Sequence, residues 1–140
     1  MDYQYLITPF CAWLIAGGLK FLINSCRARR LAFGLIGYGG LPSNHSAIVS
    51  SMAALIAIRE GISSAAFGVA MTLAFIVLLD AASLRKQIGN QAIVVNQLVK
   101  HTGIEKTQLR ERIGHSKLEI ISGILVGCAV ALGVTWAFPR

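Results

Sequence analysis

Two histidines in this 140-residue sequence stand beside residues with which they could carry out phosphoryl transfer. His45 follows Pro42-Ser43 at the start of an apolar run, and His115 precedes Glu119 by four residues, about one turn of a helix. One imidazole can attack a phosphorus atom while the other protonates the leaving oxygen. Glu119 could orient the ring of His115 and raise its basicity, as the acid of a hydrolase triad does.

Cationic residues near these histidines suit a phosphate dianion. Guanidinium groups bind phosphate oxygens in pairs and offset the charge of the transition state. The helix start at Pro42-Ser43 would add backbone N–H groups that point at an anion. Asp80 could act as the partner of one arginine. The candidate phosphate-binding residues are Lys20, Arg29, Arg30, Ser43, Arg85, Arg110 and Arg112.

Each of these residues also has an ordinary structural interpretation. The arginines between positions 27 and 30 could mark membrane topology alone, and Pro42-Ser43 could simply begin a helix. His45 and His115 could be interfacial histidines with satisfied hydrogen bonds. Burying charge at the edge of a membrane is expensive, so the concentration of several ionisable residues at one level favours a functional site.

The elements that must position these residues are apolar helices. The chain is 55% hydrophobic and only 14% charged, with a mean hydropathy of +0.65, whereas soluble domains carry about 25% charged residues. A soluble fold of this size could not bury so much apolar surface. Four apolar stretches predict transmembrane helices, over residues 3–23, 43–58, 62–79 and 118–138. The second is short and rich in Ser and Ala, which suits close packing at the centre of a bundle.

The stretch between the third and fourth spans, residues 80–117, is too long to be a bare connection. Within it Leu84, Ile88, Val95 and Leu98 recur at helical spacing, with polar residues between them. We predict an amphipathic helix over residues 82–101, lying either on the lipid headgroups or under the bundle. The predicted fold is thus an all-α, single-domain membrane bundle of four transmembrane helices plus this amphipathic helix.

The positions of Lys and Arg predict the orientation of the bundle. Ten of the thirteen fall in the two loops that follow the first and third spans. By the positive-inside rule these loops are cytoplasmic and both termini are external, in the inner (cytoplasmic) membrane. The candidate residues then share the cytoplasmic face. The net charge of +7 does not indicate nucleic acid as a partner, because the aromatic residues lie inside apolar runs and not among the basic ones.

The three cysteines form no CxxC pair, and their odd number indicates neither a disulfide framework nor a zinc site. We therefore expect no metal and no cofactor. An alternative stays open, because the residue types of His45, Asp80, His115 and Glu119 would permit a divalent ion, although their spacing is not a recognised metal pattern.

Three polar stretches also carry recognisable motifs. They read Gly-Gly-Leu-Pro-Ser-Asn-His-Ser (39–46), Asp-Ala-Ala-Ser-Leu-Arg-Lys-Gln (80–87) with Asn96-Gln97, and Gly-His-Ser-Lys-Leu-Glu-Ile (114–120). In type and order these motifs resemble the divergent branch of the type 2 phosphatidic acid phosphatase and vanadium haloperoxidase superfamily, over nearly the whole chain. The resemblance implies an α-helical, metal-independent phosphatase that acts on lipid phosphates through a phosphohistidine.

The resemblance also implies roles for single residues. His45 matches the histidine of the superfamily's Pro-Ser-Gly-His motif, which serves as general acid, with Asn44 in place of Gly. His115 with Glu119 matches the nucleophilic histidine and the Asp of the third motif, with Glu in place of Asp.

The phosphate-binding motif of the superfamily, Lys-x6-Arg-Pro, is matched only loosely. Lys20 with Arg29 or Arg30 corresponds to it, with a longer gap and no following proline. The arginine expected before the third-motif histidine is missing at its usual spacing, and Arg110 or Arg112 could substitute for it.

The leading hypothesis is a membrane-embedded phosphatase of a lipid phosphomonoester or diphosphate, such as phosphatidylglycerophosphate, phosphatidic acid or a prenyl phosphate. The missing motif residues leave an alternative, a lipid-phosphate binding or transport protein without turnover. The expected partners are the lipid phosphate and the membrane lipids. Because a four-span chain is smaller than a typical six-span lipid phosphatase, we also expect a homodimer.

Overall fold

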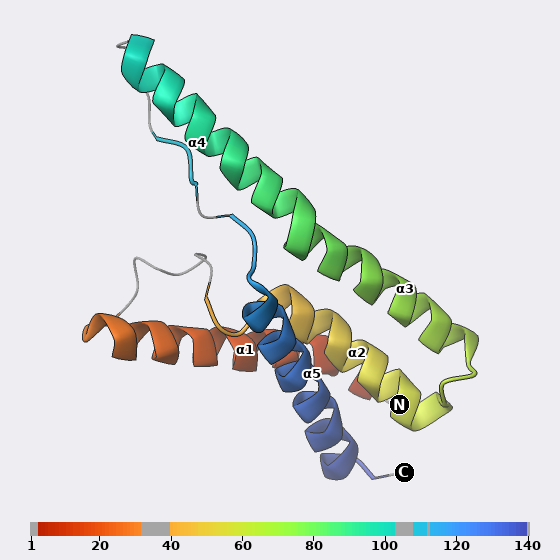
Figure 1. Cartoon of the computed structure of the whole chain (residues 1–140). Coiled ribbons are helices and arrows are strands. Elements are labelled where there is room, and N and C mark those ends of the chain that lie inside the picture. The colour runs from red at the N-terminus through yellow and green to blue at the C-terminus, as the bar shows by residue number, and fades with distance from the viewer. Residues whose placement is uncertain (1–2, 32–39, 103–107, 112, 140) are drawn as a thin grey trace.

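The computed structural model describes residues 3–31, 40–102, 108–111 and 113–139, and in these ranges the chain is all-α, as predicted. The helices are α1 (Gln4–Ala28), α2 (Asn44–Glu60), α3 (Ala65–Leu79), α4 (Arg85–Thr102) and α5 (Lys117–Ala137). A π-helical turn, Asp80–Leu84, joins α3 to α4 (Figure 1). The first helix ends at Ala28, beyond the predicted end of the apolar span at residue 23. Polar residues are unfavourable in lipid, but they can still continue a helix.

Serine side chains begin three of the helices. Ser43, Ser64 and Ser116 are the N-caps of α2, α3 and α5, and each accepts a hydrogen bond from the backbone N–H three residues later. At α5 the carboxylate of Glu119 accepts a hydrogen bond from the Ser116 N–H in return, which completes a capping box. The helix start predicted at Pro42-Ser43 is therefore confirmed.

The central element of the bundle is α2, which packs against α1, α3 and α5. Small side chains fill the contacts. Ala12, Ala16 and Ala47 form one buried cluster with Val130, and a second cluster joins α2 to α3. Because small side chains let helix backbones approach closely, the Ser- and Ala-rich sequence of α2 occupies the central position predicted for it.

The tightest contact in the bundle lies between α5 and α2. A Cβ atom added to Gly127 would lie 2.5 Å from the Ala47 carbonyl oxygen and 2.8 Å from the Ser51 nitrogen. Gly123, one turn earlier, is equally close to the Ser43 carbonyl. Two glycines four residues apart thus let α5 lie directly on the backbone of α2, and this contact holds the beginnings of both helices together.

Replacing Gly127 by alanine is expected to lower the melting temperature of the protein in detergent. The added methyl group would meet backbone atoms that cannot rotate away, and overpacking of this kind costs about 1–3 kcal/mol. The matched control is Gly133→Ala on the same helix, where no atom lies within 4 Å of the added Cβ. It should leave stability unchanged or raise it by about 0.5–1 kcal/mol through helix propensity. Equal melting temperatures for both variants would contradict the close contact.

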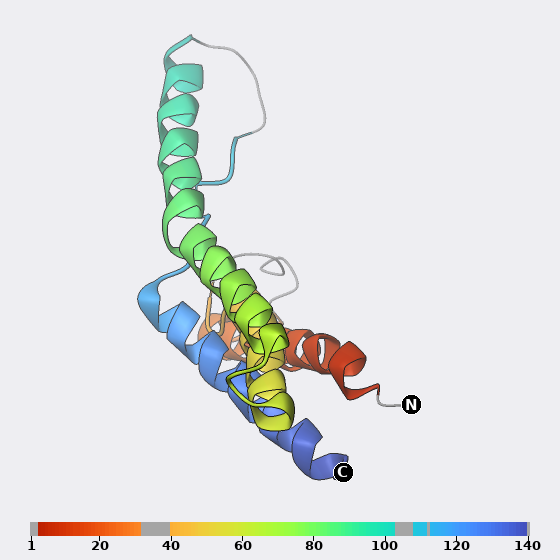
Figure 2. The ribbon, with the colours of Figure 1, turned by 90° about the vertical axis from the view of Figure 1, so that its right-hand side faces the viewer.

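The helices α3 and α4 form one continuous rod of 38 residues, Ala65–Thr102, through the π-turn. Its length is about 57 Å, and both views show it leaving the rest of the bundle (Figures 1 and 2). The predicted helix over residues 82–101 exists. Of the two places predicted for it, the one under the bundle is wrong, because among the described residues α4 packs closely on none of α1, α2 and α5. The returning segment, of which residues 108–111 and Ile113 are described, lies against it instead.

Within the described ranges, three helices are long and apolar enough to cross a membrane: Gln4–Ala28, Ala65–Thr102 and Lys117–Ala137. The predicted second span, α2, has 17 residues and is shielded by its neighbours. Its C-terminal end is joined to the beginning of α1 and the end of α5, because the Arg59 guanidinium donates hydrogen bonds to the Gln4 side chain and to the Phe138 carbonyl oxygen. The candidate functional residues Ser43 and His45 lie at the opposite, N-terminal end of α2.

Candidate active site

The imidazole rings of His45 and His115 lie beside each other, with their centroids 6.0 Å apart and their planes inclined at 51°. His45 belongs to the first turn of α2, and His115 stands two residues before α5. A reacting atom must come within about 3–3.5 Å of its attacking group. At this separation both imidazoles can contact one phosphoryl group, one from the side of the phosphorus atom and the other from the side of the leaving oxygen.

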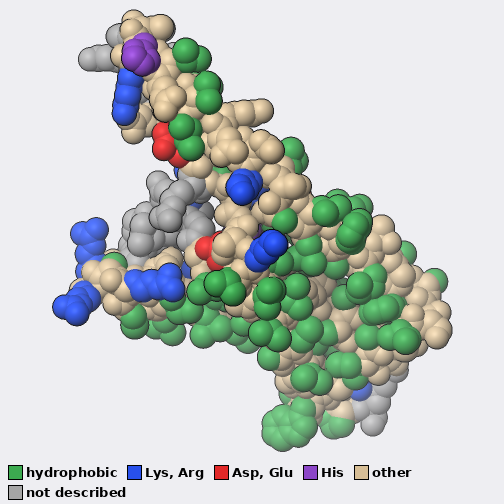
Figure 3. Space-filling view, in the orientation of Figure 1, with side chains coloured by type: hydrophobic (Ala, Val, Ile, Leu, Met, Phe, Trp, Pro, Cys, Tyr) green, Lys and Arg blue, Asp and Glu red, His purple; other side chains and the backbone are tan. Residues whose placement is uncertain are grey.

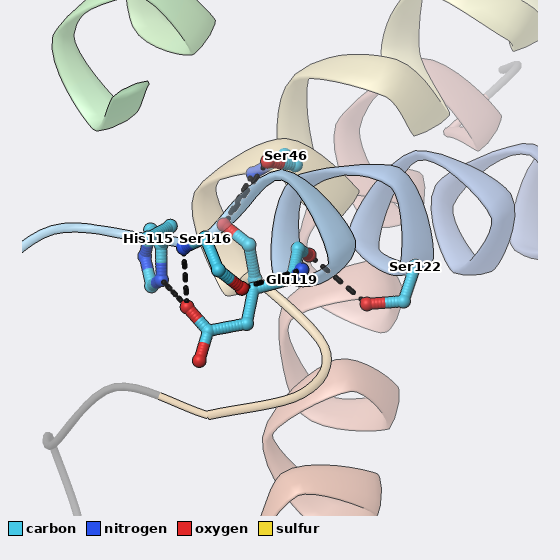
Figure 4. A network of polar contacts seen from close by, with 6 residues as sticks. Ser46, His115, Ser116, Glu119 and Ser122 are labelled. Atoms are coloured by element: carbon cyan, nitrogen blue, oxygen red, sulfur yellow. Dashed lines mark hydrogen bonds and ion pairs between the residues drawn. The ribbon is translucent and has the colours of Figure 1, made fainter. Parts of the chain in front are cut away.

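His115 is held by the carboxylate that caps α5 (Figure 4). Its Nδ1 lies 3.2 Å from Oε2 of Glu119, and the same oxygen accepts a hydrogen bond from the Ser116 N–H at 2.9 Å. In the neutral tautomer Nδ1 donates its proton to Glu119, which leaves a lone pair on Nε2. The arrangement is that of a nucleophile or base oriented by an acid.

Burial lowers the pKa of the His115 imidazole from its ordinary value of 6.5. The hydrogen bond that Glu119 accepts opposes this effect, and the positive charges of Lys20 and Arg85 add to it. The lowered pKa keeps the ring neutral at pH 7, which is the form that can attack phosphorus.

Backbone contacts fix His115 against the other elements. Its N–H donates a hydrogen bond to the carbonyl of Ala81 at 3.2 Å, within the π-turn. Gly114 has φ +114°, and a Cβ there would lie 3.1 Å from the Lys86 nitrogen. The Ser43 N–H donates to the carbonyl of Glu119 at 2.9 Å. The π-turn, the start of α2 and the start of α5 therefore meet at the two rings.

Cationic side chains come to this point from two further elements. Arg85 at the start of α4 forms an ion pair with Asp80, with Nε 2.7 Å from Oδ2. Its two Nη groups form no hydrogen bond with the residues described. Lys20 of α1 lies close enough for its charge to act on both histidines and on Glu119. Six of the predicted residues thus converge: Lys20, His45, Asp80, Arg85, His115 and Glu119.

Other predicted phosphate ligands lie elsewhere. Arg29 and Arg30 follow the last turn of α1, about 13–15 Å beyond Lys20 along the helix axis, where Lys and Arg side chains gather at the end of the helix (Figure 3). Arg110 is exposed in the segment that returns along α4. Ser43 is fully buried, and its hydroxyl accepts hydrogen bonds from the Ser46 N–H and hydroxyl. Arg112 lies outside the described residues.

One positioning residue, Asn96, received no role in the sequence analysis. Its amide nitrogen donates to the Leu109 carbonyl at 2.8 Å and to the Glu111 carboxylate at 2.9 Å, and its oxygen accepts from the Leu109 N–H. Gly89, two turns earlier on the same side of α4, makes room for the Glu111 backbone. These contacts fix the segment that leads to His115. The available signals were a glycine and an asparagine inside an otherwise helical pattern.

No three His, Cys, Asp or Glu side chains in the described part of the chain come together as metal ligands. The site is therefore described by two imidazoles, one ion pair, one lysine and the Glu119 carboxylate.

Comparison with known proteins identifies the family of the chain. A family model described as the Divergent PAP2 family matches residues 1–130. The chain is also 31% identical over 149 residues to the uncharacterized membrane protein YuiD of Bacillus subtilis (strain 168), which covers 95% of this chain and 94% of that relative. No solved structure matches. The helices, their candidate spans and the predicted resemblance lead to the same result: this chain is a membrane protein that belongs to the Divergent PAP2 family.

Proposed function

We propose that this protein is a membrane-embedded phosphatase that hydrolyses a lipid phosphomonoester or diphosphate at the cytoplasmic face. The observation that carries the proposal is the His45–His115 pair, with ring centroids 6.0 Å apart and with Glu119 bonded to Nδ1 of His115. Family membership supports a phosphatase, and the positive-inside distribution supports the cytoplasmic side.

The reaction follows from the positions of the side chains. With Nδ1 of His115 donating to Glu119, Nε2 attacks the phosphorus atom and the bond to the lipid oxygen breaks. When its ring carries a proton, His45 gives that proton to the departing oxygen. The same ring, now neutral, takes a proton from the water that hydrolyses the phosphohistidine and releases inorganic phosphate. Lys20 and Arg85 offset the charge on the phosphoryl oxygens throughout.

A lipid is the substrate best suited to this location. Hydrophobic side chains cover the helices next to the site (Figure 3), and many large ones are exposed, among them Leu14, Leu19 and Leu22 on α1. An acyl or prenyl tail would lie among them while the phosphate reaches the histidines. Phosphatidylglycerophosphate, phosphatidic acid and prenyl phosphates meet this description.

The four-span arrangement is part of the same proposal. The two ends of α2 lie at opposite ends of the bundle, with Arg59 joined to the beginning of α1 and the end of α5 and His45 at the site. Its 17 residues reach about 25 Å, the lower limit for a span, and a shielded helix does not need an apolar surface. With α2 as the second span, both termini are external.

The direct test is phosphate release by the purified protein in nanodiscs, assayed on a panel of these lipid phosphates. After mixing with ³²P-labelled substrate, denaturation without acid should trap a covalent intermediate. This intermediate should be a phosphohistidine, which acid hydrolyses. Turnover by the wild type with the label on His115 would support the proposal. No release from any member of the panel, in an intact protein, would refute it.

Replacing Glu119 by glutamine is expected to shift the pH profile of kcat/KM toward acid and to lower its plateau. The lowered pKa of His115 places the acidic limb of the profile below pH 6.5, because the ring is active only when deprotonated. Glu119 favours the protonated ring, so its loss lowers the pKa further and moves this limb to still lower pH. The plateau should fall at least about tenfold, because the imidazolium-like transition state loses its carboxylate. An acidic limb that moved to higher pH would contradict the assigned contact.

One specific observation supports a second candidate function. Arg29 and Arg30 do not reach the histidines, so Lys20 and Arg85 supply the positive charge of the pocket. A protein that binds or transports a lipid phosphate without turnover needs no more than this. It predicts saturable binding of the lipid phosphate, sensitive to Arg85→Ala, without any release of inorganic phosphate.

A further inference from the structure

One face of α4 carries an exposed apolar stripe. Leu84, Ile88, Gln91, Val95 and Leu98 follow one another at alternating spacings of four and three residues, which is the spacing of a coiled-coil seam. The four apolar members are between 41% and 59% exposed. Hydrophobic side chains are visible along this projecting part of the rod in Figure 3. A seam of this kind predicts a second helix alongside.

The chain itself does not cover the stripe. The returning segment occupies a different face of α4, where Gly89, Ala92 and Asn96 are buried. A shallow apolar hollow lies next to the stripe, lined by Asn90, Gln91, Val94 and Val95. The hollow lies between two rows of side chains, and within each row the residues are four positions apart in the sequence. A side chain of a packed helix inserts between such rows.

Lipid does not cover the stripe either if α3 spans the membrane. Counted from Ala65, the ~20 residues needed to cross the hydrocarbon end at Leu84. The remaining 18 residues form α4, which carries the chain about 27 Å farther after a bend at the π-turn (Figure 2). Ile88, Val95 and Leu98 therefore lie beyond the apolar layer, where exposed apolar side chains mark an interaction surface.

We propose that α4 pairs with α4 of a second copy of this chain in a parallel coiled coil. All copies have one orientation in a membrane, so two rods related by a two-fold axis along the membrane normal run parallel. Each seam residue then meets its own equivalent, Val95 against the partner's Val95 and Leu98 against the partner's Leu98. Gln91 meets the partner's Gln91, and a single polar pair in a seam fixes the register of the two helices.

The shortness of α4 does not prevent this pairing. An isolated coil of 18 residues would be marginal in water. Anchoring both rods in the same membrane raises their effective concentration, which replaces part of the missing contact area. The proposal depends on the geometry of the rod and not on the phosphatase proposal, so either can fail without the other.

Cysteine cross-linking in membranes tests the pairing. In a chain whose three native cysteines are replaced by alanine, Val95→Cys is compared with Gln97→Cys, which is also exposed but lies about 160° away around the helix. Mild oxidation should yield a disulfide-linked dimer of Val95→Cys at least about tenfold faster than of Gln97→Cys. Equal rates would indicate random collision and would overturn the proposal. Failure of Val95→Cys to cross-link, with protection from a membrane-impermeant maleimide, would overturn it in favour of lipid contact.

The mass of the detergent-solubilised protein gives an independent measurement. Light scattering should show a dimer for the wild type and for Gln97→Asp, and a monomer for the double variant Val95→Asp/Leu98→Asp. Its far-ultraviolet circular dichroism should remain helical, which separates loss of pairing from loss of folding. A dimer that survives the double variant would place the interface elsewhere and refute the seam.

Discussion

Replacing His115 by alanine is expected to lower kcat for lipid-phosphate hydrolysis by at least about a thousandfold, because the variant has no group that can form the covalent intermediate. Substrate binding should change little, since Lys20 and Arg85 remain. The measurement is inorganic phosphate released by matched amounts of wild type and variant in nanodiscs. His101→Ala is the matched control, because the third histidine is exposed at the end of α4, away from the site. Equal rates for wild type and His115→Ala would remove the nucleophile from the mechanism.

The companion variant His45→Ala should show a dependence on the leaving group that His115→Ala does not. A general acid matters most when the departing oxygen is a poor leaving group, as in an alkyl lipid phosphate. With an aryl phosphate, whose phenolate leaves without a proton, His45→Ala should recover much of the lost rate. His115→Ala should stay inactive on both substrates. Identical losses on both substrates in His45→Ala would show that this ring acts in another way.

Replacing Arg85 by alanine is expected to lower kcat/KM about a hundredfold or more, since a guanidinium that stabilises transition-state charge is worth several kcal/mol. The ion pair with Asp80 occupies Nε, which leaves the Nη groups available to bind an anion. Arg85→Lys should recover only part of the activity, because an ammonium keeps the charge but lacks the planar fork. The measurement is kcat and KM, determined separately with one lipid phosphate as substrate.

The control for Arg85 is Asp80→Asn, which keeps the cation but removes its brace. We expect a smaller loss of activity than in Arg85→Ala. KM should vary more from one lipid headgroup to another than it does in the wild type, because Arg85 would no longer be held in one orientation. If Arg85→Ala retained full activity, the charge of the pocket would have to come from elsewhere, such as the arginines that follow α1.

Local signals in the sequence predicted much of the site. The Pro42-Ser43 pair placed the start of α2 at Ser43, and the four-residue spacing placed Glu119 against His115. These inferences succeed because caps and helical spacing depend on residues that are close in the sequence. The membrane face that charge asymmetry assigns to the polar clusters stays a prediction.

Features that depend on contacts between distant segments could not be predicted in this way. The continuity of α3 with α4 has no marker, because a change from apolar to amphipathic sequence ends neither a helix nor its hydrogen bonding. The clamp by Asn96 and the approach of Gly127 to α2 require knowledge of the partner segment. Arg29 was grouped with Lys20 by a motif, but nine residues of continuous helix keep the two cations apart.

The Glu119 carboxylate closes the first turn of α5 and holds the ring of His115 with the same oxygen. Fraying of that single turn would release the imidazole while every membrane-crossing helix stayed in place. A preparation could therefore be fully helical and still contain inactive molecules, and the active fraction should follow hydrogen exchange at the Ser116 and Glu119 amides more closely than it follows global unfolding.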